Sequence, residues 1–200
     1  MMNALRRFFQ DARGVASLEF VVVVPMMLVL VFAVYEFGQL VRVNMKLQNA
    51  ATSIADLVSQ QAAGVTGGTA GSLGNYCEAG ELTMTPFPTN GTSGAGTFTA
   101  AIASVTNYTS GGVKEDWESD GSCNVTATGI GSSAAVSLAT GTTNVVPTAG
   151  SPGDSVIVVQ VTYTYSSAFS LLFPKLSTLT QTAYARPRNN QNITCTSPCT

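Results

Sequence analysis

The chain has 200 residues, of which 45% are hydrophobic and only 10% are charged, and its formal net charge is −2. A nucleic-acid-binding protein needs clustered lysines and arginines to neutralise phosphates, so this charge balance argues against a nucleic-acid partner. The sequence contains no histidine, which excludes Ser-His-Asp and Cys-His catalysis and removes the usual general base near neutral pH. We therefore expect a protein that is not an enzyme, with no catalytic residues and no cofactor.

A long apolar segment follows a short basic stretch at the N-terminus. Residues 15–34 form a run of twenty residues in which Ser17 and Glu19 are the polar types, and this is the length that a helix needs to cross a bilayer core of about 30 Å. We therefore expect a transmembrane helix with its membrane core at about residues 15–37, in contact with the lipid bilayer. Basic residues before the run favour a cytoplasmic N-terminus; they are Arg6, Arg7 and Arg13.

Glu19 is unusual in this run, because an ionised carboxylate in a membrane helix costs about 2–3 kcal/mol unless it has a partner. The residues from Gly14 through Val15 to Glu19 and Phe20 resemble the processing motif of type IV prepilins, whose peptidase cuts after the glycine. The resemblance implies a leader at residues 1–14, a cut between Gly14 and Val15, and pairing of the new amine of Val15 with Glu19 of a neighbouring subunit. An uncleaved signal anchor and a cleaved secretory signal peptide are the alternatives.

The helix is expected to continue beyond the membrane. Apolar residues recur at spacings of three and four from Leu40 to Val58, and no glycine or proline interrupts residues 39–63; this periodicity predicts an amphipathic helix. We expect one helix over residues 15–62, on the order of 70 Å long, whose second half offers an apolar stripe to a globular domain or to neighbouring helices. Pro25 removes one backbone hydrogen bond and is either tolerated in the membrane or a weak point at which the helix bends.

Further residues along this helix extend the resemblance. Gly14, Glu19, Phe20 and Pro25 are followed by Glu36-Phe37-Gly38 and by LQNAA at residues 47–51. This pattern resembles the TadE-like family, the minor pilins and pseudopilins of the Tad secretion system, which builds Flp-type pili. A weaker match lies at residues 152–165 and 179–188. The resemblance implies assembly and register roles for four residues, which are Glu19, Phe20, Pro25 and Glu36.

The resemblance also implies a place in the cell and a set of partners. Major Flp pilins are far shorter and usually carry tyrosine at the position of Phe20, which favours the minor class. The implied protein is a prepilin peptidase substrate in the bacterial inner membrane, with its C-terminal domain outside the cytoplasm. Its implied partners are other pilin or pseudopilin subunits and the inner-membrane assembly platform, and its role is pilus assembly, surface adhesion or export.

Two other functional classes stay open. One is a signal-anchored envelope binding protein or adhesin that is not assembled into a filament, and it predicts an uncut leader and a dispensable Glu19. The other is a membrane-anchored hydrolase that uses an acidic cluster at Asp116, Glu118 and Asp120; the absence of histidine argues against it.

Residues 63–200 are expected to form a small β-rich, disulfide-containing head domain outside the cytoplasm, which makes the fold class α+β. Residues 97–108 predict a short helix, because Phe98, Ile102 and Val105 share one helical face with Ala101. Alternating residues at 159–165 predict a half-buried strand, and residues 178–186 predict a second strand that pairs with it in antiparallel fashion. Residues 123–130 and 134–146 are candidates for further strands.

All four cysteines follow the apolar segment; they are Cys77, Cys123, Cys195 and Cys199. An even count in a translocated domain indicates disulfides in an oxidising compartment, and three pairings are possible. We favour Cys77 with Cys123 and Cys195 with Cys199, because the C-T-S-P-C turn can close on itself. A zinc site made only of cysteines is the less favoured alternative.

An acidic segment between these cysteines resembles part of an EF-hand calcium loop. Asp116, Glu118, Asp120 and Gly121 occupy positions 1, 3, 5 and 6 of such a loop, where carboxylates would converge on one ion. Ala127 stands at position 12, where an EF-hand has glutamate. We therefore favour a solvated acidic loop, with no metal site; calcium bound by Asp116, Glu118 and Asp120 is the less favoured alternative.

Overall fold

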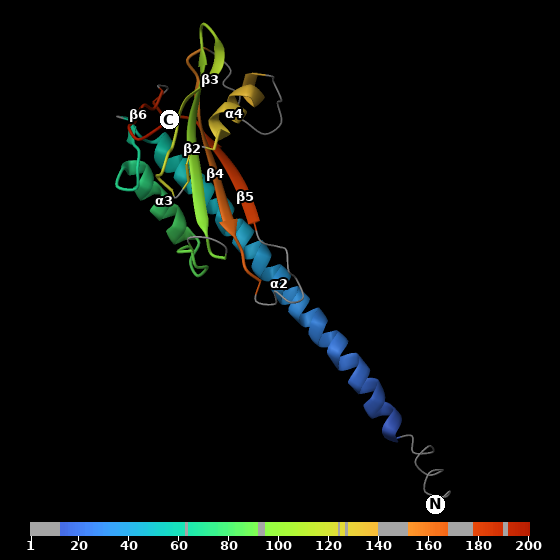
Figure 1. Ribbon diagram of the computed structural model, residues 1–200. Coiled ribbons are helices and arrows are strands. Elements are labelled where there is room, and N and C mark those ends of the chain that lie inside the picture. The colour runs from blue at the N-terminus through green and yellow to red at the C-terminus, as the bar shows by residue number, and fades with distance from the viewer. Residues whose placement is uncertain are drawn as a thin grey trace, which may run out of the picture. The chain divides into compact units, whose positions relative to one another are not determined.

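A computed structural model describes residues 13–62, 64–91, 95–123, 125–126, 128–139, 152–167, 178–189 and 192–200 (Figure 1). It confirms the α+β class, with a long N-terminal helix and a β-sheet domain. The chain divides into two compact units, Met1–Val41 and Arg42–Thr200. We call the second unit the head. The expected leader falls largely outside the described residues, which begin at residue 13.

Helix α2 (Arg13–Ser59) crosses the boundary between these units as one 47-residue element with Pro25 inside it. The helix expected over residues 15–62 is therefore confirmed as far as Ser59. We refer to residues 13–41 as its N-terminal half and to residues 42–59 as its C-terminal half. The helix ends where Gln61 donates its backbone N–H to the carbonyl of Val58, a contact that closes the last turn.

A four-stranded antiparallel sheet forms the centre of the head, in the order β3-β2-β4-β5 (Figure 1). Its strands are β2 (Phe98–Tyr108), β3 (Gly112–Glu118), β4 (Ser155–Thr164) and β5 (Thr178–Ala185). The expected antiparallel pairing of the last two strands is confirmed, and its register runs from Ile157 opposite Ala185 to Thr164 opposite Thr178. A small parallel pair, β1 (Val65–Thr66) with β6 (Cys195–Thr196), completes the strands.

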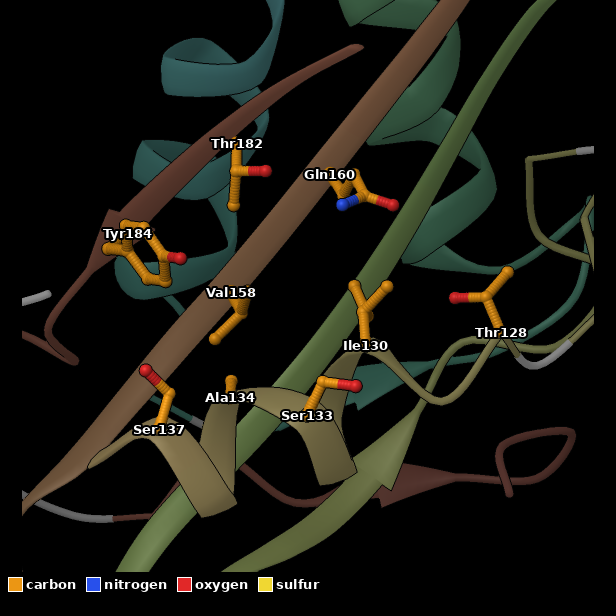
Figure 2. A pocket seen from close by; sticks show the side chains of 9 residues that line it. All are labelled: Thr128, Ile130, Ser133, Ala134, Ser137, Val158, Gln160, Thr182 and Tyr184. Carbon is orange, nitrogen blue, oxygen red and sulfur yellow. The ribbon is translucent and has the colours of Figure 1, made fainter. Parts of the chain in front are cut away.

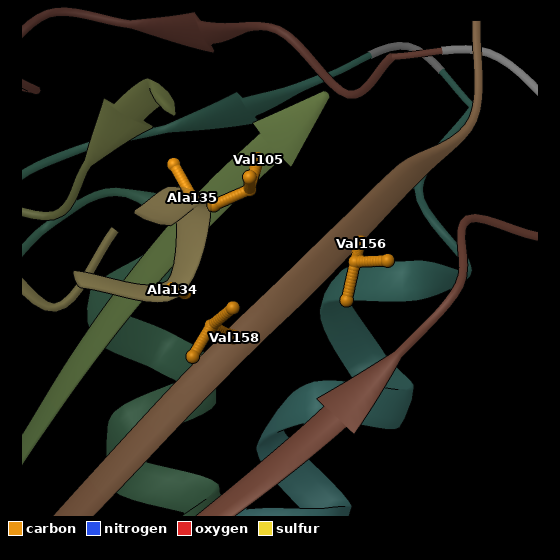
Figure 3. Close-up of a cluster of buried hydrophobic side chains, with 5 residues drawn as sticks. All are labelled: Val105, Ala134, Ala135, Val156 and Val158. Carbon is orange, nitrogen blue, oxygen red and sulfur yellow. The ribbon is translucent and has the colours of Figure 1, made fainter. Parts of the chain in front are cut away.

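The two faces of this sheet are covered by different helices. On one face, Gly80 of α3 (Ser72–Thr83) approaches Ile54 of α2 and Phe98 of β2. The amide of Gln181 on β5 donates to the Asn44 side chain of α2 at 2.7 Å. On the other face, α4 (Ile130–Ala139) closes a small apolar cluster (Figure 3). Its members are Val105, Ala134, Ala135, Val156 and Val158. The C-terminal half of α2 is thus part of the core of the head.

Three expectations about the head are wrong. Residues 98–108 form strand β2 and not a helix, since this strand is central, buried on both faces, and therefore shows no simple alternation. Of the strand expected at residues 134–146, residues 134–139 belong to helix α4, and residues 140–146 lie outside the described residues. Within residues 123–130, the described positions contain no strand. In addition, helix α3 and strand β3 were not predicted.

Two disulfides tie the head together in the favoured pairing. Cys77 of α3 is joined to Cys123 with a Cα–Cα distance of 5.7 Å, and Cys195 is joined to Cys199 at 6.3 Å. Both distances lie in the normal range for disulfides. All four cysteines are paired, which leaves none for the alternative zinc site.

Candidate functional site

The N-terminal half of α2 is the candidate functional site, and its main feature is an exposed apolar surface. Residues 20–37 cover about 27 Å of helix, close to the thickness of a bilayer core. Glu19–Ser59 is the helix, among the described residues, that is long and apolar enough to cross a membrane. Large exposed side chains surround this half of the helix, including Phe20, Val22, Met26, Leu28, Leu30, Val34 and Phe37. This surface is consistent with single-pass anchoring in a membrane.

The predicted processing residues lie in the first turn of this helix. The backbone is helical from Arg13 onward, so Gly14 and Val15 both have helical conformation. Val15 and Glu19 are four residues apart and therefore share one face of the helix, about 6 Å apart along its axis. Glu19 is exposed. An amine formed at Val15 would therefore lie on the same face as this carboxylate.

The other predicted assembly residues lie in different environments. Phe20 is 69% exposed, and Pro25 is exposed within the helix. Glu36 is only 3% exposed and lies about 25 Å from Glu19 along the helix axis. The structure therefore does not bring the two glutamates together, and the shared role assigned to them stays a prediction.

The C-terminal half of α2 has the opposite surface. Its apolar stripe is buried, as expected for a helix that packs against a globular domain. The buried positions are Val43, Leu47, Ala50, Ala51, Ile54, Ala55 and Val58. Lys46 also donates a hydrogen bond to the carbonyl of Thr83 in α3 at 3.0 Å. This half of the helix is thus held by the head.

Part of the acidic segment does not form the expected solvated loop. Asp116 and Glu118 lie in β3, whereas Asp120 follows the end of that strand. A register shift opposite Ser104 and Val105 leaves Asp116 with no residue opposite it on β2. Asp116 accepts hydrogen bonds from Ser104, Thr106 and Tyr108 at 2.9, 2.5 and 2.5 Å. The hydrogen bond from Tyr108 is the main reason that the pKa of this phenol lies above its ordinary value.

Glu118 has a structural role that sequence reasoning missed. It is 1% exposed and accepts hydrogen bonds from the N–H and the hydroxyl of Thr128 at 2.5 and 2.7 Å. These contacts place a carboxylate at the N-terminus of α4, where the helix dipole favours a negative charge. Asp116 and Glu118 therefore accept hydrogen bonds from different residues. Among the described residues, no group of three or more acidic, cysteine or histidine side chains could hold a metal ion, and Asp120 does not complete such a group.

Comparison with known proteins identifies one family. Residues 14–56 match the family model of TadE-like proteins. This segment contains all the residues of the helix on which the resemblance was based, and it extends into the buried C-terminal half. No curated protein and no solved structure matches the chain. Over residues 14–56, which span most of α2, the chain is therefore similar to TadE-like proteins, and the resemblance is confirmed there.

Proposed function

We propose that this protein is a minor pilin or pseudopilin of a Tad-type pilus or secretion system. The observation that carries the proposal is the construction of α2, which combines the match to TadE-like proteins with an exposed apolar N-terminal half and a buried C-terminal half. A helix that is apolar on all sides suits lipid or packed neighbouring helices. A head attached to such a helix suits a subunit that is stored in a membrane and then assembled.

The proposed processing step is hydrolysis of the peptide bond between Gly14 and Val15 by a prepilin peptidase. It leaves a positively charged amine on Val15. In a filament, this amine pairs with the Glu19 carboxylate of a neighbouring subunit, because two opposite charges attract strongly where water is excluded. The pairing fixes the axial position of one subunit against the next.

The proposed location is the bacterial inner membrane, with the head outside the cytoplasm. The two disulfides of the head support an oxidising compartment. The partners are the prepilin peptidase, other pilin or pseudopilin subunits, and the inner-membrane assembly platform. The function is assembly of the pilus, surface adhesion or export.

Mass spectrometry of the protein recovered from native membranes tests the proposal. We expect a mature chain that begins at Val15, and we expect Gly14→Leu to block its formation because the peptidase would meet a bulky side chain. We expect Glu19→Ala to leave processing intact and to prevent incorporation into pili. Asp56→Ala, which removes an exposed carboxylate from the same helix, is the matched control and should be incorporated normally.

The opposite results would assign a different class. An uncut leader together with normal behaviour of Glu19→Ala would indicate an anchored envelope binding protein that does not enter a filament.

A further inference from the structure

A pocket of about 380 Å³ lies on the α4 face of the sheet (Figure 2). One wall comes from α4 and the residues before it, and the other comes from neighbouring positions of β4 and β5. This volume is in the range of small-ligand sites. The lining side chains are Thr128, Ile130, Ser133, Ala134, Ser137, Val158, Gln160, Thr182 and Tyr184.

The strand register explains how four of these residues form one surface. Val158 lies opposite Tyr184, and Gln160 lies opposite Thr182. Because residues two apart on a strand share a face, these four side chains form a compact patch, as Figure 2 shows. The patch begins where the apolar cluster under α4 ends, since Val158 belongs to both.

The pocket is polar but carries no charge. Its polar groups are five hydroxyls and one amide, and none of its lining residues is ionised at neutral pH. Two carboxylates near this wall already have partners: Glu118 accepts from the lining residue Thr128, and Glu115 accepts from Ser132. Burial raises the pKa of Tyr184, so its phenol keeps its proton. A charged ligand would lose water here and gain no opposite charge in return.

The groups in the pocket can both donate and accept hydrogen bonds. Hydroxyls and a primary amide do both. Val158, Ile130 and the ring of Tyr184 add apolar surface between them. A ligand that matches this lining has many neutral hydroxyls on its edges and weakly polar C–H faces.

We propose that the pocket is a binding site for a short neutral oligosaccharide. Sugar rings have hydroxyls that pair with Gln160 and Thr182, and C–H faces that pack on the partly buried Tyr184 and Ile130. The polar row continues along the same face to the neighbouring pair Thr162 and Thr180, whose hydroxyls are 3.4 Å apart. This row offers further contacts to a longer saccharide. The site goes beyond assembly, because it would give the head a ligand whether or not the chain enters a filament.

The test uses the full chain, purified in a zwitterionic detergent, because maltoside and glucoside detergents would themselves present sugars to the site. Saturation-transfer NMR and calorimetry would be run with neutral trisaccharides of glucose, galactose, mannose and N-acetylglucosamine, together with trigalacturonate and a Gly-Ser peptide. We expect at least one neutral trisaccharide to bind with a Kd at or below about 1 mM.

Three variants assign this binding to the pocket. Gln160→Ala and Thr182→Val should each weaken it by about tenfold or more, since each leaves a sugar hydroxyl without its partner. Thr178→Val is the matched control: Thr178 lies on the same face of β5 as Thr182 and outside the pocket, so this variant should bind normally. The single tryptophan, Trp117, reports that each variant is folded.

Specific results would overturn the proposal. These are no binding of any neutral trisaccharide at about 10 mM, binding that both pocket variants leave unchanged, or preferred binding of trigalacturonate or of the peptide. Because this assay does not involve cleavage or pili, its failure is distinguishable from failure of the pilin proposal.

Discussion

The two halves of α2 are both rich in apolar residues, yet their surroundings differ. In the N-terminal half, the apolar residues occur on all sides and are exposed, whereas in the C-terminal half they form a stripe that is buried. A helix that is apolar on all sides needs an apolar solvent, and a helix with one apolar stripe needs a single packed face. The comparison teaches that the angular distribution of apolar residues, more than their number, distinguishes membrane contact from packing in the head.

The largest expected effect concerns the stability of the head. Leu47 is fully buried, so Leu47→Ala should lower the free energy of unfolding by about 2–5 kcal/mol through lost burial and a residual cavity. Leu28 is 50% exposed, so Leu28→Ala should change it by less than about 0.5 kcal/mol. Denaturant unfolding followed by fluorescence of the buried Trp117 measures both. Equal effects of the two substitutions would break the comparison.

A charge placed in each half should affect membrane anchoring differently. Leu28→Arg should disfavour insertion by about 2.5–3.5 kcal/mol, because the guanidinium would lie within the bilayer core. Met45 is also exposed, at 63%, but it lies in the C-terminal half, and Met45→Arg should leave insertion unchanged. The measurement is the fraction of protein that resists extraction from membranes by alkaline carbonate. A similar loss for Met45→Arg would place the membrane boundary further along the helix.

Two glycines test how closely the two halves of α2 are packed: Gly80 of α3 lies against the C-terminal half, and Gly38 lies in the N-terminal half. A Cβ at Gly80 of α3 would lie 2.5 Å from Cδ1 of Ile54, whereas a Cβ at Gly38 would meet nothing within 4 Å. Gly80→Val should therefore destabilise the head by about 1–3 kcal/mol through overpacking, while Gly38→Val should change stability by less than about 0.5 kcal/mol. Thermal unfolding monitored by Trp117 compares them. A neutral Gly80→Val would show that Ile54 moves aside without cost.

The smallest expected effect is a loss of head stability at alkaline pH that leaves the N-terminal half of α2 helical. Burial raises the pKa of Tyr163 and Tyr184, and the hydrogen bond to Asp116 raises the pKa of Tyr108. A raised folded-state pKa stabilises the head fully below the unfolded pKa of about 10, and this contribution is lost as the pH rises through the folded value. Trp117 fluorescence should report a small loss of head stability above about pH 10, while the helical circular dichroism of the N-terminal half, measured in lipid, persists.

A control separates tyrosine ionisation from general alkaline damage. Tyr108→Phe should show a smaller loss of stability across this pH range, since it removes one ionising group. An identical pH profile for the two proteins would contradict the role given to Tyr108.

Sequence reasoning was accurate where the physical signal is local. The helix over residues 15–62 and the strand pair at 159–165 and 178–186 follow directly from periodicity, and the structure has both. It failed for β2, because the consecutive apolar residues 100–103 of a strand covered on both faces also match the spacing of a buried helix. It also failed for α4, whose start depends on the Glu118 carboxylate reaching Thr128 from another strand.

The candidate sites also differ in whether a local sequence pattern reveals them. Gly14, Val15, Glu19 and Phe20 could be singled out because their motif is contiguous and stands beside an apolar run. The pocket could not, because its lining comes from separate segments of the chain and consists of common neutral residues such as Ser133, Gln160 and Thr182. No local pattern distinguishes these residues from ordinary surface positions.

The sequence by itself determined the existence, length and two-part character of α2, since the bilayer thickness and the 3.6-residue helical period act on contiguous residues. It also favoured the disulfide pairing, which the structure has. Only the tertiary structure decided that Glu36 is buried, that Asp116 and Glu118 serve different partners, and that a neutral polar pocket lies between α4 and the sheet. These features arise from contacts between segments far apart in the chain, whose distances are set by packing and not by local preference.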